Sequence, residues 1–218
     1  MKPARLSVVK VGGSLLDLPD LCSRLERWWQ NRPTGTIHWL VVGGGLQVDT
    51  IRENWAADRC DDVEAHWSSI KAMRQNSARL AERCVDCFNH IQVQSPSGTV
   101  PVLAAHEGST VFLDVEAVLR EMAKRDAAAP LPCDWSVTSD SIAAAIAIAY
   151  RAAECVLLKS RLPVSVVNWA GLAREGYVDE HFPELADRLS CVRLTDLRAD
   201  PCVGWPPELR WEDDVWWD

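Results

Sequence analysis

The sequence predicts an α/β fold built on parallel strands, because one pattern occurs twice near its start. An apolar run at residues 6–11 ends in Gly12-Gly13-Ser14, and a helical pattern follows. A second apolar run at residues 36–42 ends in Gly43-Gly44-Gly45, and another helical pattern follows. Two strand–glycine–helix units in series need helical crossovers between parallel strands. The carboxyl ends of such strands share one edge of the sheet, so both glycine turns are expected there.

The rest of the chain continues this alternation of helices and strands. The spacing of apolar residues predicts helices at residues 17–32, 46–57, 61–89, 112–125, 142–153 and 178–189. Short apolar runs predict strands at residues 91–94, 100–104, 155–158 and 191–194, and residues 163–169 read as a strand or an extended segment. Neither a linker nor a tandem repeat divides the chain. We therefore expect a single domain over residues 1–218, ending in an acidic tail rich in tryptophan and proline at residues 200–218.

Composition limits the class of function. The 218 residues are 48% hydrophobic and carry a formal net charge of -8. An acidic chain of this kind is not expected to bind nucleic acid or a membrane surface. Every apolar run falls well short of the roughly 20 residues of a membrane span, and the first strand ends too early for a signal peptide. We therefore expect a cytoplasmic protein that acts on a small molecule.

Eight cysteines are many for such a protein, but their spacing is irregular. Only Cys84 and Cys87 form a CxxC pair, and His90 lies nearby without a convincing fourth ligand. A structural zinc site usually needs a second pair or two histidines. We therefore predict no metal site here and interpret the cysteines as ordinary buried thiols.

The turn at Gly12, Gly13 and Ser14 is suited to holding a phosphate group. Glycines let backbone N–H groups approach an anion, and the following helix adds partial positive charge. Lys10 places a full positive charge at the same strand end. The alternative is a structural turn beside a lysine that extends to solvent. For Gly43, Gly44 and Gly45 the alternative is close packing alone.

Two further charged residues are predicted at this edge of the sheet. Asp140 lies in the first turn of an alanine-rich helix, and Lys159 ends the strand predicted at residues 155–158. Phosphoryl transfer needs such a set, because its catalysis consists of positioning and charge stabilisation. The alternatives are a first-turn aspartate that stabilises its helix and a lysine that merely ends a strand. The sequence lacks GxxxxGK[ST] and also lacks GxGxxG after either strand, which disfavours P-loop and dinucleotide-binding enzymes.

Three motifs together resemble the amino acid kinase family, which includes acetylglutamate, aspartate, uridylate and carbamate kinases. They are KVGGSLLD at residues 10–17, VVGGG at residues 41–45 and TSDSIAA at residues 138–144. The resemblance implies a three-layer αβα sandwich around a mainly parallel sheet, assembled as a homo-oligomer. It also implies ATP with Mg²⁺ as the phosphoryl donor.

The same resemblance assigns roles to individual residues. Lys10 would contact the phosphoryl group in flight, Asp140 would organise the catalytic lysines, and Lys159 would face the leaving phosphate. The Gly12–Ser14 turn would bind the phosphates of ATP. The acceptor would be held by Gly43, Gly44 and Gly45 together with Thr138 and Ser139, although the last two are also candidate helix caps.

The chain departs from the family pattern in its nucleotide half. Residues 158–163 lack the glycine that many members carry after this strand, and a later lysine-glycine motif is not found. Motifs at residues 66–73, 135–141, 158–160 and 178–183 resemble a branch that includes the kinase of aminomethyl-furanmethanol phosphate in methanofuran biosynthesis. We therefore predict phosphoryl transfer from ATP to a phosphate monoester. The alternatives are a carboxylate acceptor, or a protein on this fold that binds a nucleotide or anion without turnover.

Three other residues near these motifs have open roles. Asp49 would touch substrate or belong to a solvated helix face. His66 would contact substrate or pack at the start of its helix. Trp135 would stack on an aromatic acceptor or serve packing alone.

Overall fold

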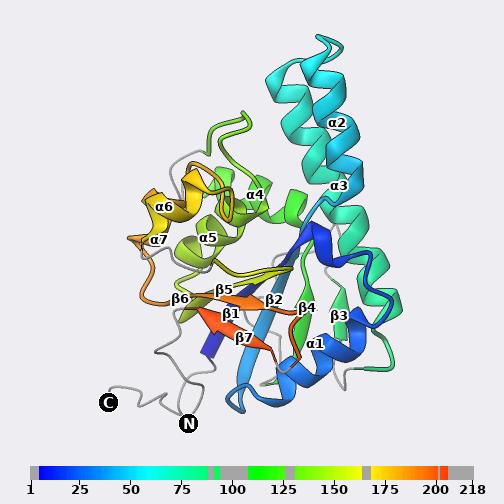
Figure 1. The fold of residues 1–218 in the computed structure, drawn as a ribbon, viewed down its shortest axis with the longest axis vertical. Helices are drawn as coiled ribbons and strands as arrows, with labels where there is room; N and C mark the ends of the chain where they lie inside the picture. The colour runs from blue at the N-terminus through cyan, green and yellow to red at the C-terminus, as the bar shows by residue number, and fades with distance from the viewer. Residues whose placement is uncertain are drawn as a thin grey trace.

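The computed structural model describes residues 5–87, 91–93, 108–125, 131–163, 168–200 and 202–205. Within these residues one sheet has the strand order β3-β4-β2-β1-β5-β6-β7 (Figure 1). The strands are β1 (Arg5–Val11), β2 (Thr36–Val42), β3 (Ile91–Val93), β4 (Thr110–Phe112), β5 (Glu154–Lys159), β6 (Val192–Asp196) and β7 (Val203–Trp205). Strands β1 to β6 run parallel and β7 pairs antiparallel with β6, which confirms the mainly parallel sheet.

Helices cover both faces of this sheet and give the expected three-layer αβα sandwich. They are α1 (Leu21–Gln30), α2 (Leu46–Ala56), α3 (Asp62–Arg83), α4 (Val115–Lys124), α5 (Ser139–Ala149), α6 (Trp169–Arg174) and α7 (Phe182–Ala186), with a short 3-10 helix at Gly13–Leu15. One hydrophobic core lies on the side of α4 to α7 and a second on the side of α1. Helices α2 and α3 form a hairpin that projects from the body of the molecule (Figure 1).

The alternation of side chains along the strands decides where the two predicted lysines point. Val8 in β1 and Leu157 in β5 both belong to the core on the α5 side of the sheet. Residues two apart in a strand share a face. Lys10 and Lys159 each lie two positions further along, so both side chains point to the α5 side. The register pairs Lys10 with Leu157, so Lys159 lies further toward the carboxyl edge.

Two predicted helices were too long, and an aspartate side chain accepts a hydrogen bond from the start of each. The predicted helix at residues 112–125 begins at Val115, because residues up to Phe112 form β4. Asp114 Oδ1 accepts a hydrogen bond from the backbone N–H of Ala117 (3.0 Å) and so starts the helix. The predicted helix at residues 178–189 is reduced to α7, whose N-cap is His181; Asp179 lies before it and accepts from the N–H of Phe182 (2.9 Å).

Other boundaries shift by a few residues. The helix predicted at 17–32 is α1, which starts after the 3-10 turn, and the helix predicted at 142–153 is α5, which starts earlier. The helix predicted at 61–89 ends at Arg83. Trp169 begins α6 and is not part of a strand, and a further strand that was not predicted, β7, follows β6. The strand predicted at residues 100–104 and the tail from residue 206 to 218 lie outside the described residues.

The cysteine prediction is wrong at one pair. Cys22 of α1 and Cys84, which follows α3, form a disulfide with a Cα–Cα distance of 5.3 Å. Cys87 of the CxxC pair is a free thiol. Among the described residues, His, Cys, Asp and Glu nowhere gather in groups of three or more that could hold a metal ion. The helices of the described residues are all too short or too polar to cross a membrane.

Candidate active site

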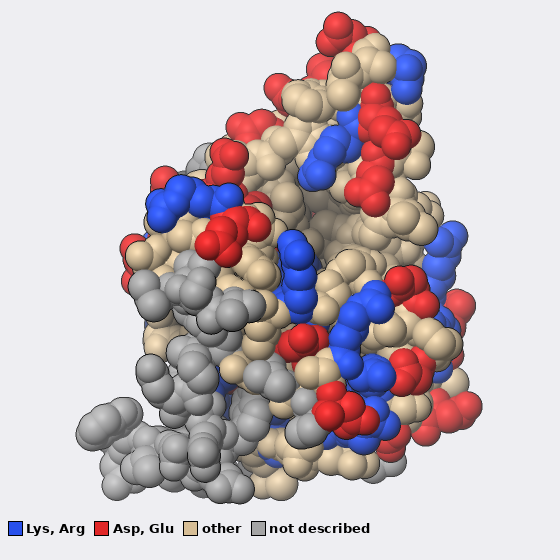
Figure 2. Space-filling model, viewed as in Figure 1, with Lys and Arg blue, Asp and Glu red and all other residues tan. Residues whose placement is uncertain are grey.

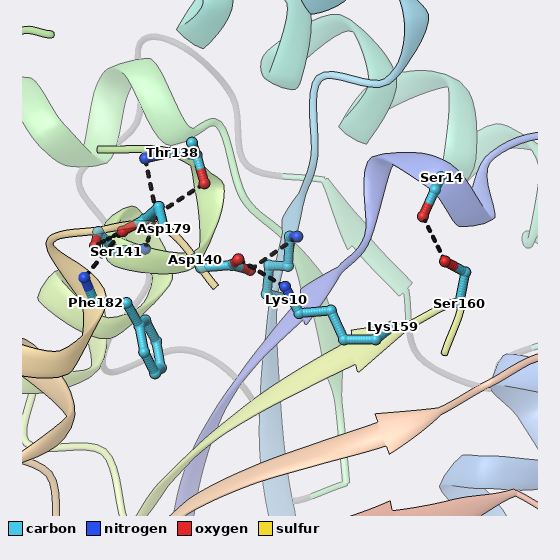
Figure 3. A network of polar contacts seen from close by, with 9 residues as sticks. All are labelled: Lys10, Ser14, Thr138, Asp140, Ser141, Lys159, Ser160, Asp179 and Phe182. Atoms are coloured by element: carbon cyan, nitrogen blue, oxygen red, sulfur yellow. Dashed lines mark hydrogen bonds and ion pairs between the residues drawn. The ribbon is translucent and has the colours of Figure 1, made fainter. Parts of the chain in front are cut away.

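Three predicted catalytic residues meet at the carboxyl edge of the sheet. Asp140 lies in the first turn of α5, and its carboxylate lies between two ammonium groups (Figure 3). Lys10 Nζ is 2.9 Å from Asp140 Oδ1, and Lys159 Nζ is 2.6 Å from Asp140 Oδ2. All three side chains are largely buried, with exposed fractions of 7%, 6% and 13% for Lys10, Asp140 and Lys159. Each oxygen of Asp140 is therefore used by one lysine.

The pKa values of Asp140 and Lys159 are both lowered in this cluster, for different reasons. Burial raises the pKa of Asp140, but the attraction of Lys10 and Lys159 outweighs it and lowers the pKa to about 2. Burial is the largest cause acting on the pKa of Lys159 and lowers it; Asp140 raises it and Lys10 lowers it, and the net pKa is about 8. At neutral pH the cluster therefore carries two positive charges and one negative charge. This excess positive charge suits a site that binds anionic groups.

The two glycine turns continue the strand ladder and touch each other. Gly12 N–H donates to Leu158 O (2.9 Å), and Gly43 N–H donates to Val11 O (2.9 Å). A Cβ added to Gly13 would lie 2.6 Å from the backbone nitrogen of Gly45. Close packing of backbone against backbone therefore requires glycine here, as one of the sequence alternatives proposed. Close packing and anion binding are compatible explanations for these glycines, because both depend on the missing side chain.

Asn76 holds the second turn in place and was missed by the sequence analysis. Its side-chain nitrogen donates to Gly43 O (3.0 Å) and Gly44 O (2.9 Å) from the buried face of α3. Gly45 has a φ of +57°, which favours glycine, and starts α2. A polar residue between the buried Met73 and Leu80 was the sequence signal that could have identified Asn76.

The first turn is also held by segments that lie far away in sequence. Ser14 Oγ donates to Ser160 Oγ (3.0 Å), directly after β5 (Figure 3). The Arg198 guanidinium donates to Ser14 O (2.8 Å) and to Asp17 Oδ1 (2.8 Å). Arg198 lies after β6, and its sequence context gave no signal for this contact. The turn, the end of β5 and the end of β6 therefore form one connected wall.

A cavity of about 680 Å³ opens beside the cluster, between α2, α3 and residues 134–142. Figure 2 shows the hollow between the α2–α3 hairpin and the body of the molecule. Several predicted binding residues line it: Gly13, Ser14, Gly44, Gly45, Thr138 and Ser139. Gly12, Gly43, Lys10, Asp140 and Lys159 are not lining residues. Because Ser139 lines the cavity, it reaches the immediate sequence neighbour of Asp140 in the buried cluster.

The outer wall of the cavity carries aromatic and cationic side chains. The Arg52 guanidinium lies 4.6 Å from the centre of the Trp135 ring, and Trp55 meets the same ring edge-on at 5.8 Å. Arg79 of α3 lines the cavity as well. Among the described residues, neither Arg52 nor Arg79 forms an ion pair with a carboxylate. Asp49 and His66 also line the cavity, so their predicted contact with substrate stays a prediction.

The N-terminus of α5 is capped differently from the prediction. Thr138 is the N-cap residue, but its side chain makes no capping hydrogen bond. Instead Thr138 Oγ1 and its backbone N–H both donate to Asp179 Oδ2 (2.8 Å each) (Figure 3). Ser139 is the first helical residue. The proposed roles of Thr138 and Ser139 in substrate binding stay predictions.

Comparison with known proteins agrees with this arrangement. Residues 5–161 match the sequence model of the amino acid kinase family. The chain belongs to the amino acid kinase family. The match to this family ends at residue 161, so Asp179 and Arg198 lie beyond it. No curated protein sequence gives a significant match to the chain.

Solved structures of the same fold include kinases of nucleotides and of an amino acid. UMP kinase from Bacillus anthracis is 16% identical with a TM-score of 0.60, covering 91% of this chain and 89% of its own. Uridylate kinase from Archaeoglobus fulgidus is 14% identical with a TM-score of 0.51, covering 86% and 88%. Aspartate kinase from Synechocystis is 14% identical with a TM-score of 0.54, covering 87% of this chain and 37% of its own. At these identities the likeness supports the fold alone.

Proposed function

We propose that this protein is an ATP-dependent kinase that transfers the γ-phosphoryl group to a phosphate monoester. The observation that carries the proposal is the Lys10–Asp140–Lys159 cluster at the sheet edge, beside two glycine turns that touch. A site for holding an anion needs no second buried lysine on a shared carboxylate. Phosphoryl transfer does, because negative charge spreads over the transferring group and both neighbouring oxygens.

The reaction balances with these groups in place. An oxygen of the acceptor phosphate attacks the γ-phosphorus, the bond from that phosphorus to the bridging oxygen breaks, and ADP leaves with the electron pair. Lys10 donates to the oxygens of the group in transfer, and Lys159 donates to the leaving phosphate. Asp140 stays ionised throughout, because its pKa is about 2, and it fixes both ammonium groups. A phosphate acceptor is already anionic near neutral pH, so the chain needs no general base.

The cavity arginines support an anionic acceptor, although Asp17, Asp49, Asp62 and Asp134 line the same cavity. Arg52 and Arg79 line it without carboxylate partners among the described residues, and α2 begins at Leu46, directly after the Gly43–Gly45 turn. Guanidinium groups suit phosphate oxygens, because they present several N–H donors in one plane. Aminomethyl-furanmethanol phosphate, the acceptor of the branch that the motifs resemble, is an anion of this kind. A carboxylate acceptor would pair with the same arginines, so the acceptor class is decided by experiment.

The described residues do not fit a metal held by the protein. Both oxygens of Asp140 are bonded to lysines, and a second carboxylate does not join them among the described residues. Mg²⁺ would therefore arrive on the phosphates of ATP, where it would neutralise part of their charge. No step of the reaction is assigned to a protein-bound metal.

An acceptor panel tests the proposal. ADP release is measured with Mg-ATP and, in turn, aminomethyl-furanmethanol phosphate, UMP, aspartate, acetylglutamate and carbamate. We expect turnover with a phosphate monoester. Turnover with a carboxylate alone would replace the acceptor class, and tight ATP binding without turnover would indicate a protein that only binds nucleotide.

Variants at one cavity arginine separate acceptor binding from donor binding. Arg79→Gln is expected to raise KM for the acceptor about tenfold or more, with little change in KM for ATP. Arg188→Gln removes an exposed arginine after α7, outside the cavity, and is the matched control. Equal kinetics in the two variants would remove Arg79 from the acceptor site.

A further inference from the structure

One buried carboxylate outside the matched family region bonds to the start of the helix that carries Asp140. Asp179 lies before α7 and is 9% exposed. Its Oδ2 accepts from the Thr138 N–H, the Thr138 hydroxyl and the Ser141 N–H (3.0 Å). Its Oδ1 accepts from the Ser141 hydroxyl and the Phe182 N–H. Five donors therefore converge on one carboxylate, and four of them belong to the start of α5.

These contacts replace an ordinary helix cap. In an ordinary cap, the side chain of the N-cap residue accepts from an N–H two or three residues later. Thr138 instead donates, and the carboxylate that accepts from Ser141 comes from 38 residues further along the chain. Asp140 lies between the two residues that Asp179 holds. The backbone is therefore fixed on both sides of the residue that fixes the two lysines.

We propose that Asp179 is a positioning residue for phosphoryl transfer, acting through the first turn of α5 to hold Asp140 between Lys10 and Lys159. This inference rests on the proposed kinase function for its kinetic consequences only. The geometry itself is independent of the substrate. Without the carboxylate, buried N–H groups at the start of α5 would lose their acceptor and the turn would loosen. A displacement of about 1 Å at Asp140 would then move both ammonium groups away from the reacting oxygens.

Asp179 also contributes charge to the cluster. Its carboxylate raises the pKa of Lys159, in the same direction as Asp140 and against Lys10. Asp196 of β6 is the register partner of Lys159, but its carboxylate accepts from the backbone N–H groups of Arg198 and Ala199. The net pKa of Lys159 is about 8, and burial is the largest cause of its lowering. Removing the charge of Asp179 therefore lowers this pKa further and discharges Lys159 nearer to neutral pH.

Two measurements on Asp179→Asn test the proposal. We expect kcat to fall on the order of a hundredfold, and the alkaline limb of the kcat–pH profile to move to lower pH. In protein labelled with ¹³C at the lysine ε-carbon, the titration midpoint of Lys159 should move the same way. Loss of the resonance in Lys159→Arg assigns it. Asp187→Asn, an exposed neutralisation directly after α7, is the matched control and should leave both unchanged.

The outcomes separate this inference from the proposed function. A folded Asp179→Asn variant with wild-type kcat, or with a lower kcat but an unmoved Lys159 midpoint, would overturn the positioning role. If wild-type protein turns over no acceptor, the kinase proposal fails. The role of Asp179 is then decided by whether Asp179→Asn lowers the titration midpoint of Lys159 in the NMR experiment.

A second variant decides if Asp179→Asn does not fold. Ser141→Ala removes one donor to Asp179 and keeps every charge. It should lower kcat several-fold without moving the alkaline limb. Wild-type kcat in folded Ser141→Ala would then overturn the proposal.

Discussion

Replacing Lys10 by methionine tests the centre of the proposed mechanism. Methionine fills a similar volume in the buried site but carries no charge. Lys10 Nζ lies 2.9 Å from Asp140 Oδ1, and its side chain is 7% exposed, so its charge acts where water screens little. The variant therefore removes one of two cations from the predicted path of the phosphoryl group and leaves the hydrophobic core intact.

The expected magnitudes differ for activity and stability. Losing one donor that stabilises transition-state charge costs about 2.7–4 kcal/mol, which is about 10²–10³ in kcat. Breaking a buried ion pair costs about 3–5 kcal/mol when its partner is left uncompensated. Asp140 keeps Lys159 at 2.6 Å, however, and repulsion between the lysines disappears. We therefore expect a net loss of under about 2 kcal/mol of unfolding free energy, or about 8 °C in Tm at most.

The assay combines ADP release with thermal unfolding. Lys71→Met removes an exposed lysine of α3 and serves as the control for the loss of a positive charge. Wild-type turnover in Lys10→Met would refute the assigned role. A loss of turnover that merely follows unfolding at the assay temperature would refute it as well, because the reasoning requires a folded, inactive enzyme.

Three further predictions follow from the geometry. As the pH rises through about 8, kcat should fall because Lys159 loses its charge. Between about pH 8 and the ordinary lysine pKa of 10.5 the unfolded chain binds more protons than the folded one, so the free energy of unfolding should increase with pH. Opposite trends in a kcat profile and in urea unfolding would confirm this, and parallel trends would contradict it. Gly13→Ala should abolish turnover and lower Tm, because the new Cβ would lie 2.6 Å from the Gly45 nitrogen; an unchanged Tm would show that the turns are further apart. Reduction of the Cys22–Cys84 bridge should cost about 2–4 kcal/mol, visible as a lower Tm in dithiothreitol that Cys22→Ser reproduces and that is absent if the thiols are free in solution.

Local sequence was enough to predict strands β1, β2, β5 and β6 and the sheet edge at which the candidate residues meet. Alternation along β1 and β5, glycines at the strand ends and an aspartate after a capping motif are all signals within a few residues. Lys10, Asp140 and Lys159 therefore meet where the patterns predicted. The glycine turns were also placed correctly, although their mutual contact needed the structure to be seen.

Long-range contacts could not be predicted in this way. Asp179 lies inside the helix predicted at residues 178–189, yet its carboxylate accepts from the start of α5 as well as from Phe182 of α7. Arg198 reaches Ser14 across 184 positions of sequence, and Cys22 reaches Cys84 across 62. Patterns in one stretch carry no information about such partners. The strand β4 was misread for a different reason: three residues are too few to show a period.

The backbone contact between the two glycine turns has a consequence for how ligands influence each other. Gly13 and Gly45 meet without any side chain between them, so a displacement of either turn is transmitted to the other at once. An anion that reshapes the first turn must change the affinity of the second for its own ligand, and thermodynamic reciprocity makes the reverse effect equal. Random addition of two substrates with independent affinities is therefore not expected from this architecture; synergy or antagonism between them is.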